Sequence, residues 1–169
     1  GAFEFQGQKC SAASRMYAPK SLWPAILEKI KDSASKVKMG DVRDFDNFIN
    51  AVIDETSFDN IASYIDYAKN SPEAEIVLGG GYDKSKGYFV EPTVIVTTNP
   101  HFKSMEEEIF GPVLTVYVYE DADVDATAEL CDKTSPYGLT GAIWGRDRVA
   151  LERLATKLRY AAGNFYIND

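Results

Sequence analysis

Seven consecutive residues, Val113-Leu114-Thr115-Val116-Tyr117-Val118-Tyr119, decide the fold. All but Leu114 are β-branched or aromatic, and such residues favour a buried β-strand. The rest of the chain alternates between predicted helices over Asp123–Lys133 and Val149–Tyr160, the second capped by Asp147, and predicted strands over Leu139–Trp144 and Asn164–Asn168. Strands that alternate with helices form right-handed βαβ crossovers and a parallel sheet. We therefore predict an α/β fold in three layers (αβα), with a mostly parallel sheet and helices on both faces.

The first half of the chain contains elements of the same kinds. Residues Gly1–Phe5 are typical of the end of a strand, and Arg15–Ala18 of a short strand. Apolar residues at helical spacing predict one amphipathic helix that Ser21 can cap and a second that Thr56 or Ser57 can cap. We expect these helices to cover the sheet.

A cysteine follows a glycine turn in the segment Gln6-Gly7-Gln8-Lys9-Cys10-Ser11-Ala12-Ala13-Ser14-Arg15. The small residues after Cys10 favour a short helix, which would place this thiol at a helix N-terminus. The unpaired N–H groups and the dipole there favour the thiolate, the nucleophilic form. The Cys10 amide could also stabilise the oxyanion that forms when the thiolate attacks a carbonyl. The alternative is a buried structural cysteine, because free cysteine is often buried.

Composition limits the classes of function. The 169 residues fit one domain, and 45% hydrophobic with 26% charged residues is typical of a globular protein. A net charge of -8 argues against nucleic-acid and membrane partners, which require a basic face. The apolar runs are too short to span a membrane. Cys10 and Cys131 are the two cysteines, and they form neither a disulfide framework nor a C-x-x-C pair.

Four further segments accompany the cysteine. They are Gly87-Tyr-Phe-Val-Glu-Pro-Thr93, Glu106-Glu-Glu-Ile-Phe-Gly-Pro-Val113, Tyr137-Gly-Leu-Thr-Gly141 and Gly163-Asn-Phe-Tyr-Ile-Asn168. Together, over essentially the whole chain, they resemble the catalytic domain of the aldehyde dehydrogenase superfamily. The residues around Cys10, with Ser21–Pro24, Ala51–Asp54 and the last nine residues, are most similar to the branch that oxidises glutamate semialdehyde (pyrroline-5-carboxylate) to glutamate with NAD in proline catabolism.

The resemblance implies roles for four residues. Cys10 would form a thiohemiacetal and then a thioester with the substrate, and Ser11 would contact the substrate carboxylate. Glu108 would bind the nicotinamide ribose of NAD, and Phe110 would pack beside the ring. An alternative remains open for each of two residues. The acidic triplet that contains Glu108 could be a solvated face, and the Ser11 hydroxyl could bond its own backbone.

The resemblance also implies an organisation. Residues 1–169 would form a single, thiol-bearing catalytic domain that is truncated at both ends, without the nucleotide-binding domain, the general base, the oxyanion asparagine or the substrate-anchor loop. The parent enzyme would be a homo-oligomer in the mitochondrial matrix; without the resemblance, a cytoplasmic protein is expected, since no targeting segment precedes Cys10. The isolated fragment would be inactive and would not bind NAD tightly.

Two other hypotheses about function compete with the dehydrogenase. The chain could be a non-catalytic folded fragment that associates through exposed sheet edges. It could also be a cysteine hydrolase, for which His101 is the one available histidine.

We expect His101 to be a surface residue, Cys131 to be inert, and no metal to bind. The triple glycine Gly79–Gly81 could cradle phosphate, although a turn is favoured there.

Overall fold

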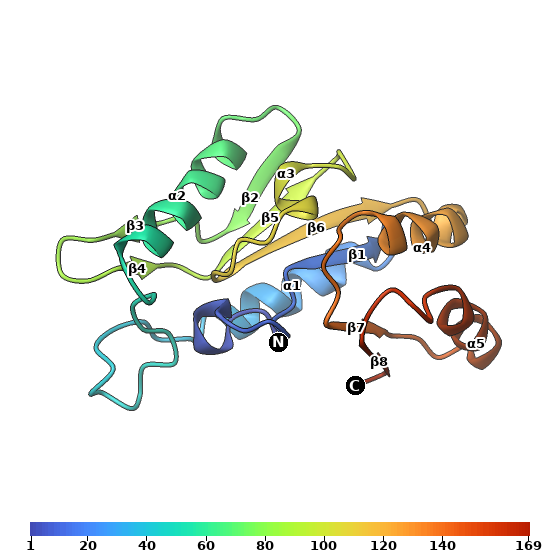
Figure 1. Ribbon diagram of the computed structural model, residues 1–169, viewed down its shortest axis with the longest axis horizontal. Helices are drawn as coiled ribbons and strands as arrows, with labels where there is room; N and C mark the ends of the chain where they lie inside the picture. Colours follow the sequence, from blue (N-terminus) through green and yellow to red (C-terminus); the bar gives the residue numbers. More distant parts are fainter.

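The computed structural model describes residues 1–169, and a four-stranded sheet lies at its centre (Figure 1). The strand order is β1 (Arg15–Pro19), β6 (Val113–Tyr119), β5 (Thr93–Thr97) and β2 (Ala74–Leu78). β1 and β5 pair parallel with the central β6, and β2 pairs antiparallel with β5 at one edge. The prediction of a mostly parallel sheet is confirmed.

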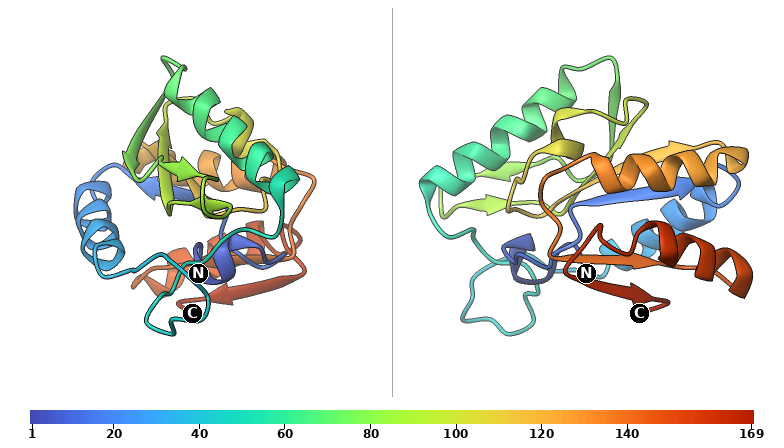
Figure 2. Two further views of the ribbon diagram at one scale, coloured as in Figure 1. Left: turned by 90° about the vertical axis from the view of Figure 1, so that its left-hand side faces the viewer. Right: turned by 45° about the vertical axis from the view of Figure 1, so that its right-hand side comes forward.

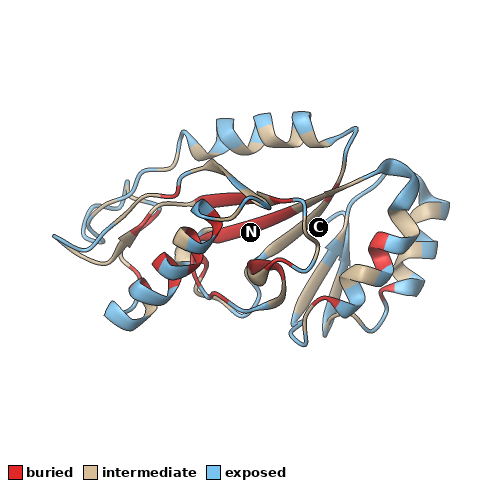
Figure 3. Cartoon of the chain, turned by 90° about the horizontal axis from the view of Figure 1, so that it is seen from above, coloured by how far each residue is buried: buried red, intermediate tan, exposed pale blue.

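Helices cover both faces of this sheet, as predicted, because side chains alternate between the faces along each strand. On one face, helix α2 (Glu55–Lys69) packs against Ile95 and Val113. Its apolar stripe consists of Phe58, Ile61, Tyr64, Ile65 and Ala68. On the other face, helix α1 (Trp23–Ala34) packs against Val94 and Leu114. Figure 2 shows the two helices on opposite sides of the sheet, and in Figure 3 the buried residues concentrate in the central strands.

The last two predicted strands do not join the main sheet. β7 (Thr140–Ile143) and β8 (Asn164–Ile167) instead pair parallel with each other in a separate two-stranded sheet. Helix α4 (Val124–Lys133) precedes β7, and helix α5 (Arg148–Lys157) connects the two strands. Asp147 caps α5, as predicted, because its carboxylate accepts hydrogen bonds from Val149 and Ala150. The alternation of strands and helices was predicted correctly here, but the membership of the sheet was not.

Short elements complete the fold. They are the 3-10 helices η1 (Glu4–Gly7) and η2 (Asp121–Asp123), the strands β3 (Tyr82–Asp83) and β4 (Phe89–Val90), and the one-turn helix α3 (Lys103–Glu106). β3 and β4 form an antiparallel pair. α3 ends at Glu106, the first residue of the acidic triplet, so its end helps to place that segment.

The structure corrects the predictions for the amino-terminal segment. Gly1–Phe5 is not the end of a strand, because its last two residues already belong to η1. Cys10 does not begin a helix either; it lies in a turn that the Ala12 amide closes on the Lys9 carbonyl at 3.0 Å. Four residues separate Cys10 from β1, too few for a helix in addition to the turn.

Two predicted helix caps are also wrong. The side chain of Ser21 bonds to Asp121, and α1 begins without a side-chain cap. Asp54 caps α2 by accepting a hydrogen bond from the Ser57 amide at 2.8 Å. Ser57 therefore supplies the donor in this cap, and neither it nor Thr56 is the capping residue.

Candidate active site

A pocket lies where three segments enter their strands. Its lining comes from within Gly7–Arg15, which leads into β1, Glu107–Val113, which leads into β6, and Ser135–Thr140, which leads into β7. Ligands of open α/β sheets usually bind at the carboxyl ends of the strands. This pocket lies at the amino ends of β1 and β6, which are parallel. The fold type alone would therefore have indicated the opposite edge of the sheet, the one at the carboxyl ends of β1 and β6, as the place of the pocket.

The pocket contains three of the four predicted site residues. Cys10, Glu108 and Phe110 line it, from segments about a hundred positions apart in the sequence, whereas Ser11 is absent from the lining. Ser11 is exposed, and its carbonyl oxygen accepts a hydrogen bond from the Thr140 hydroxyl at 3.2 Å. The alternative, a bond from the Ser11 hydroxyl to its own backbone, is not formed.

Cys10 is an exposed free thiol on one wall of this pocket. Neither its backbone amide nor that of Ser11 donates a hydrogen bond within the chain. These N–H groups are therefore available to an oxygen atom next to the thiol, as oxyanion stabilisation requires. The predicted helix dipole is missing, because the Cys10 turn is not followed by a helix.

The turn that carries Cys10 contacts the segment that carries Glu108. Gly7 has a φ of +65°, and a Cβ atom at this position would lie 2.2 Å from the Gly111 carbonyl oxygen. A Cβ atom on Gly111 would in turn lie 2.5 Å from a side-chain carbon of Ile61 in α2. Only glycine permits both approaches. The pairing of Gly7 with Gly111 therefore fixes the two walls relative to each other and to α2.

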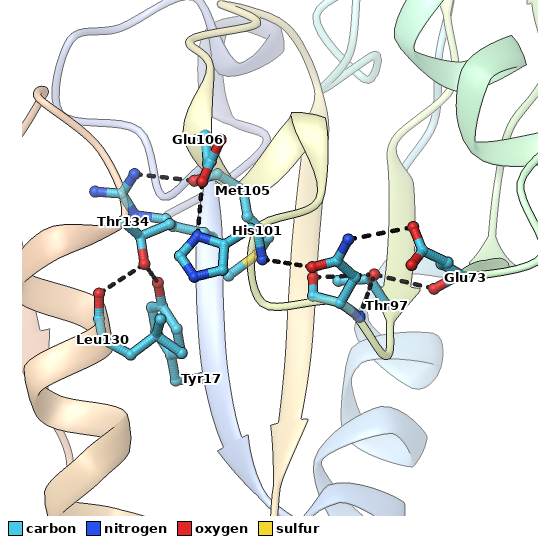
Figure 4. A network of polar contacts seen from close by, with 10 residues as sticks. Tyr17, Glu73, Thr97, His101, Met105, Glu106, Leu130 and Thr134 are labelled. Carbon is cyan, nitrogen blue, oxygen red and sulfur yellow. Dashed lines mark hydrogen bonds and ion pairs between the residues drawn. The ribbon is translucent and has the colours of Figure 1, made fainter.

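The three carboxylates of the acidic triplet differ in their partners. Glu106 lies 2.7 Å from Nδ1 of His101 (Figure 4). Glu107 accepts a hydrogen bond from the hydroxyl of Tyr64, a buried residue of α2. Glu108 has no hydrogen bond and no ion pair within the chain. Since it also lines the thiol pocket, Glu108 is the one carboxylate of the three that is free to bind a ligand there.

Burial and the contact with Glu107 shift the titration of Tyr64. Burial of the ring, with the Glu107 hydrogen bond and negative charge as further causes, raises the pKa of Tyr64 from 10.0 to about 12. Both effects oppose formation of a tyrosinate. Tyr64 belongs to the α2 stripe, so this bond attaches the triplet to the core.

Three polar residues that the sequence analysis did not single out hold the pocket segments. Gln8 accepts a hydrogen bond from the Ile53 amide at 2.9 Å, and Gln6 accepts one from the Asn50 amide at 3.2 Å. Arg15 donates to the carbonyl groups of two other segments. The two glutamines on either side of Gly7 are visible in the sequence as polar residues next to the turn. Their partners could not be predicted, because they are backbone groups 44 and 45 positions away.

The remaining candidates lie outside this pocket. His101 is not among its lining residues, so the structure does not form the cysteine–histidine pair of a hydrolase. Cys131 is half-buried, and burial raises the pKa of its thiol. Its helix α4 contacts β1, where the Tyr17 hydroxyl bonds to Thr134 at 2.9 Å (Figure 4). Within the triple glycine, the Gly80 amide donates to the Thr93 hydroxyl and the Gly81 amide to the Glu91 carboxylate.

No group of three or more histidine, cysteine, aspartate or glutamate side chains is arranged to hold a metal ion. None of the helices is both long enough and apolar enough to cross a bilayer.

Known proteins resemble this chain over its whole length. It is 59% identical over 169 residues to a mitochondrial delta-1-pyrroline-5-carboxylate dehydrogenase of Dictyostelium discoideum and 49% identical to the human protein of that name. The matches cover 100% and 99% of this chain, respectively, but the chain spans about 30% of the length of either relative. The fold matches a delta-pyrroline-5-carboxylate dehydrogenase from Mycobacterium tuberculosis, crystallised with NAD, with a TM-score of 0.90 at 40% identity, over 100% of this chain and 30% of that one.

The family comparison covers the same range. The model of the aldehyde dehydrogenase family matches residues 1–169, which include all three walls of the pocket. Both the predicted superfamily and the predicted fold class are thereby confirmed. The chain belongs to the aldehyde dehydrogenase family.

Proposed function

We propose that this chain is the thiol-bearing part of an NAD-dependent dehydrogenase that oxidises glutamate semialdehyde, the open form of pyrroline-5-carboxylate, to glutamate. One observation carries the proposal: the exposed Cys10 thiol, with an unused amide, shares a pocket with the unpaired carboxylate of Glu108. The relatives named pyrroline-5-carboxylate dehydrogenases support the choice of substrate.

Cys10 provides the nucleophile in this proposal. Its sulfur forms a bond to the aldehyde carbon, and the carbonyl oxygen becomes an oxyanion that can accept a hydrogen bond from the Cys10 amide. When that carbon loses a hydride, the product held on Cys10 is a thioester. Water then cleaves the carbon–sulfur bond, which releases the acid and returns the thiol. We assign no residue of this chain as the general base for this last step.

The pocket fits part of the cofactor. When bound, NAD supplies the acceptor for the hydride. The carboxylate of Glu108 has both oxygens available, and a carboxylate can accept hydrogen bonds from both hydroxyls of a ribose diol. Phe110 has a φ of +59° and is 44% exposed, so its ring is accessible beside that carboxylate. These two residues are the ones that we assign to the nicotinamide ribose and ring.

The proposal extends to organisation and location. Residues 1–169 would form one catalytic domain, and the nucleotide-binding domain and the general base would lie outside it. The full-length protein would be a homo-oligomer with a small aldehyde as its substrate. We place it in mitochondria, which the word mitochondrial in the relatives' names supports. The 169-residue chain alone should therefore form no NADH from glutamate semialdehyde.

Substitution of Cys10 in the full-length enzyme tests the proposal. We expect Cys10→Ser to abolish NADH formation and to leave the dissociation constant for NAD nearly unchanged, because the sulfur forms the covalent bond and only borders the cofactor. Cys131→Ser is the matched control and should retain activity. Continued oxidation by Cys10→Ser, or loss of activity in the control alone, would contradict the assignment.

A further inference from the structure

We infer that Arg15 is a positioning residue. It holds two walls of the pocket, the Glu108 wall (Glu107–Val113) and the Tyr137 wall (Ser135–Thr140), at fixed places relative to Cys10. The inference rests on the proposed function, since it concerns the hydride step of that reaction. Arg15 is the first residue of β1, five positions after Cys10, and it lines the same pocket.

The guanidinium joins segments that are distant in the sequence. Nη1 donates to the Met105 carbonyl oxygen at 3.1 Å, and Nη2 donates to the Tyr137 carbonyl oxygen at 3.2 Å. These partners are 90 and 122 positions from Arg15. Met105 lies three residues before Glu108, and Tyr137 belongs to the segment that enters β7. One side chain therefore connects the three walls of the pocket.

Arginine is suited to this task. Its planar guanidinium presents several N–H donors in a fixed geometry, so two separate carbonyl groups can be bound at once. The Met105 carbonyl lies in the last turn of α3, where backbone acceptors have no partner within the helix. Arg15 forms no ion pair with a carboxylate, so these two carbonyl groups are its hydrogen-bond partners. A lysine at this position would present a single charged group and could not reproduce the fork.

Loss of the guanidinium should affect the walls differently. The Cys10 turn keeps the Gly7–Gly111 contact and the Gln8 bond to Ile53. The end of α3 and the Tyr137 segment would each lose a charge-assisted hydrogen bond. Loss of Arg15 should therefore change the distance over which the hydride moves, but not the exposure of the Cys10 thiol. A misplacement of about 1 Å can slow an enzyme about 100-fold.

The test compares Arg15→Ala and Arg15→Lys with Arg43→Ala in the full-length enzyme. Arg43 is an exposed arginine that pairs with Asp41 in its own loop, away from the pocket. Single-turnover NADH formation reports the hydride step, and alkylation by iodoacetamide reports the accessibility of Cys10. We expect Arg15→Ala to slow NADH formation about 10- to 100-fold and to change Cys10 alkylation less than about threefold. Added guanidinium at a non-denaturing concentration should restore part of the rate, which a general loss of folding would not allow.

Three results would overturn the inference. These are an Arg15→Ala rate equal to that of Arg43→Ala, equal slowing of both readouts without rescue, and a wild-type rate for Arg15→Lys. If the alanine variant fails to fold, Arg15→Lys still decides, because it keeps the charge and should fold but react more slowly than wild type. Failure of the proposed function has a different signature, in which the wild-type enzyme forms no NADH or Cys10→Ser remains active.

Discussion

Replacement of Gly7 by alanine should destabilise the chain and displace the Cys10 turn. The φ of +65° at Gly7 is left-handed, and a residue with a Cβ atom pays about 1–2 kcal/mol there. The new methyl group would also lie 2.2 Å from the Gly111 carbonyl oxygen, a backbone atom that cannot rotate away. Overpacking of this kind costs about 1–3 kcal/mol. The two costs together predict a loss of about 2–5 kcal/mol in the free energy of unfolding.

Urea denaturation of the 169-residue chain measures this loss. Gly145→Ala is the matched control, because a Cβ atom at Gly145 would meet only the flexible side chain of Leu151, at 3.2 Å, and the residue has no positive φ. We expect the control to change the free energy of unfolding by less than about 1 kcal/mol. If Gly7→Ala is no more destabilising than Gly145→Ala, the proposed close contact between the two pocket walls is wrong.

Three further predictions follow from the pocket. In the full-length enzyme, Glu108→Gln should slow single-turnover NADH formation about 10- to 100-fold, since charge-assisted hydrogen bonds contribute about 1.5–3 kcal/mol; Glu106→Gln is the control, and equal effects would indicate a solvated acidic face. In the folded chain, alkylation at neutral pH followed by mass mapping should find Cys10 labelled faster than Cys131, whose pKa burial raises; faster labelling of Cys131 would refute this. Because the pKa of Tyr64 rises from 10.0 to about 12 on folding, its contribution to stability is complete below pH 10 and is lost as the pH rises through about 12; an absorbance titration in which Tyr64→Phe removes no ionisation near pH 12 would contradict it.

Sequence patterns predicted the core well. The β-branched run that ends at Tyr119 forms the central strand, and the Asp147 cap is confirmed. These features depend on local propensity and on burial, which nearby residues determine. The separate β7–β8 sheet was not predicted, because sheet membership depends on contacts between distant segments.

The site was predictable only in part. The glycine turn indicated Cys10 and the resemblance to the aldehyde dehydrogenases added Glu108. The structure places both residues in one pocket, and their chemical roles are proposals. The expected helix after Cys10 is absent, because the Lys9–Ala12 turn and the start of β1 leave no room for it. Arg15 was not predicted at all. Its partners are backbone carbonyl groups, which every residue possesses, so no sequence signal identifies them.

Isolation of the covalent intermediate tests the central claim most directly. The full-length enzyme would be mixed with glutamate semialdehyde and NAD, quenched in acid within the first turnover, digested, and mapped by mass spectrometry. The account predicts that the acyl group is found as a thioester on the peptide that contains Cys10. NADH formation accompanied by an acyl group on Cys131, or by no acyl group on Cys10, would contradict it.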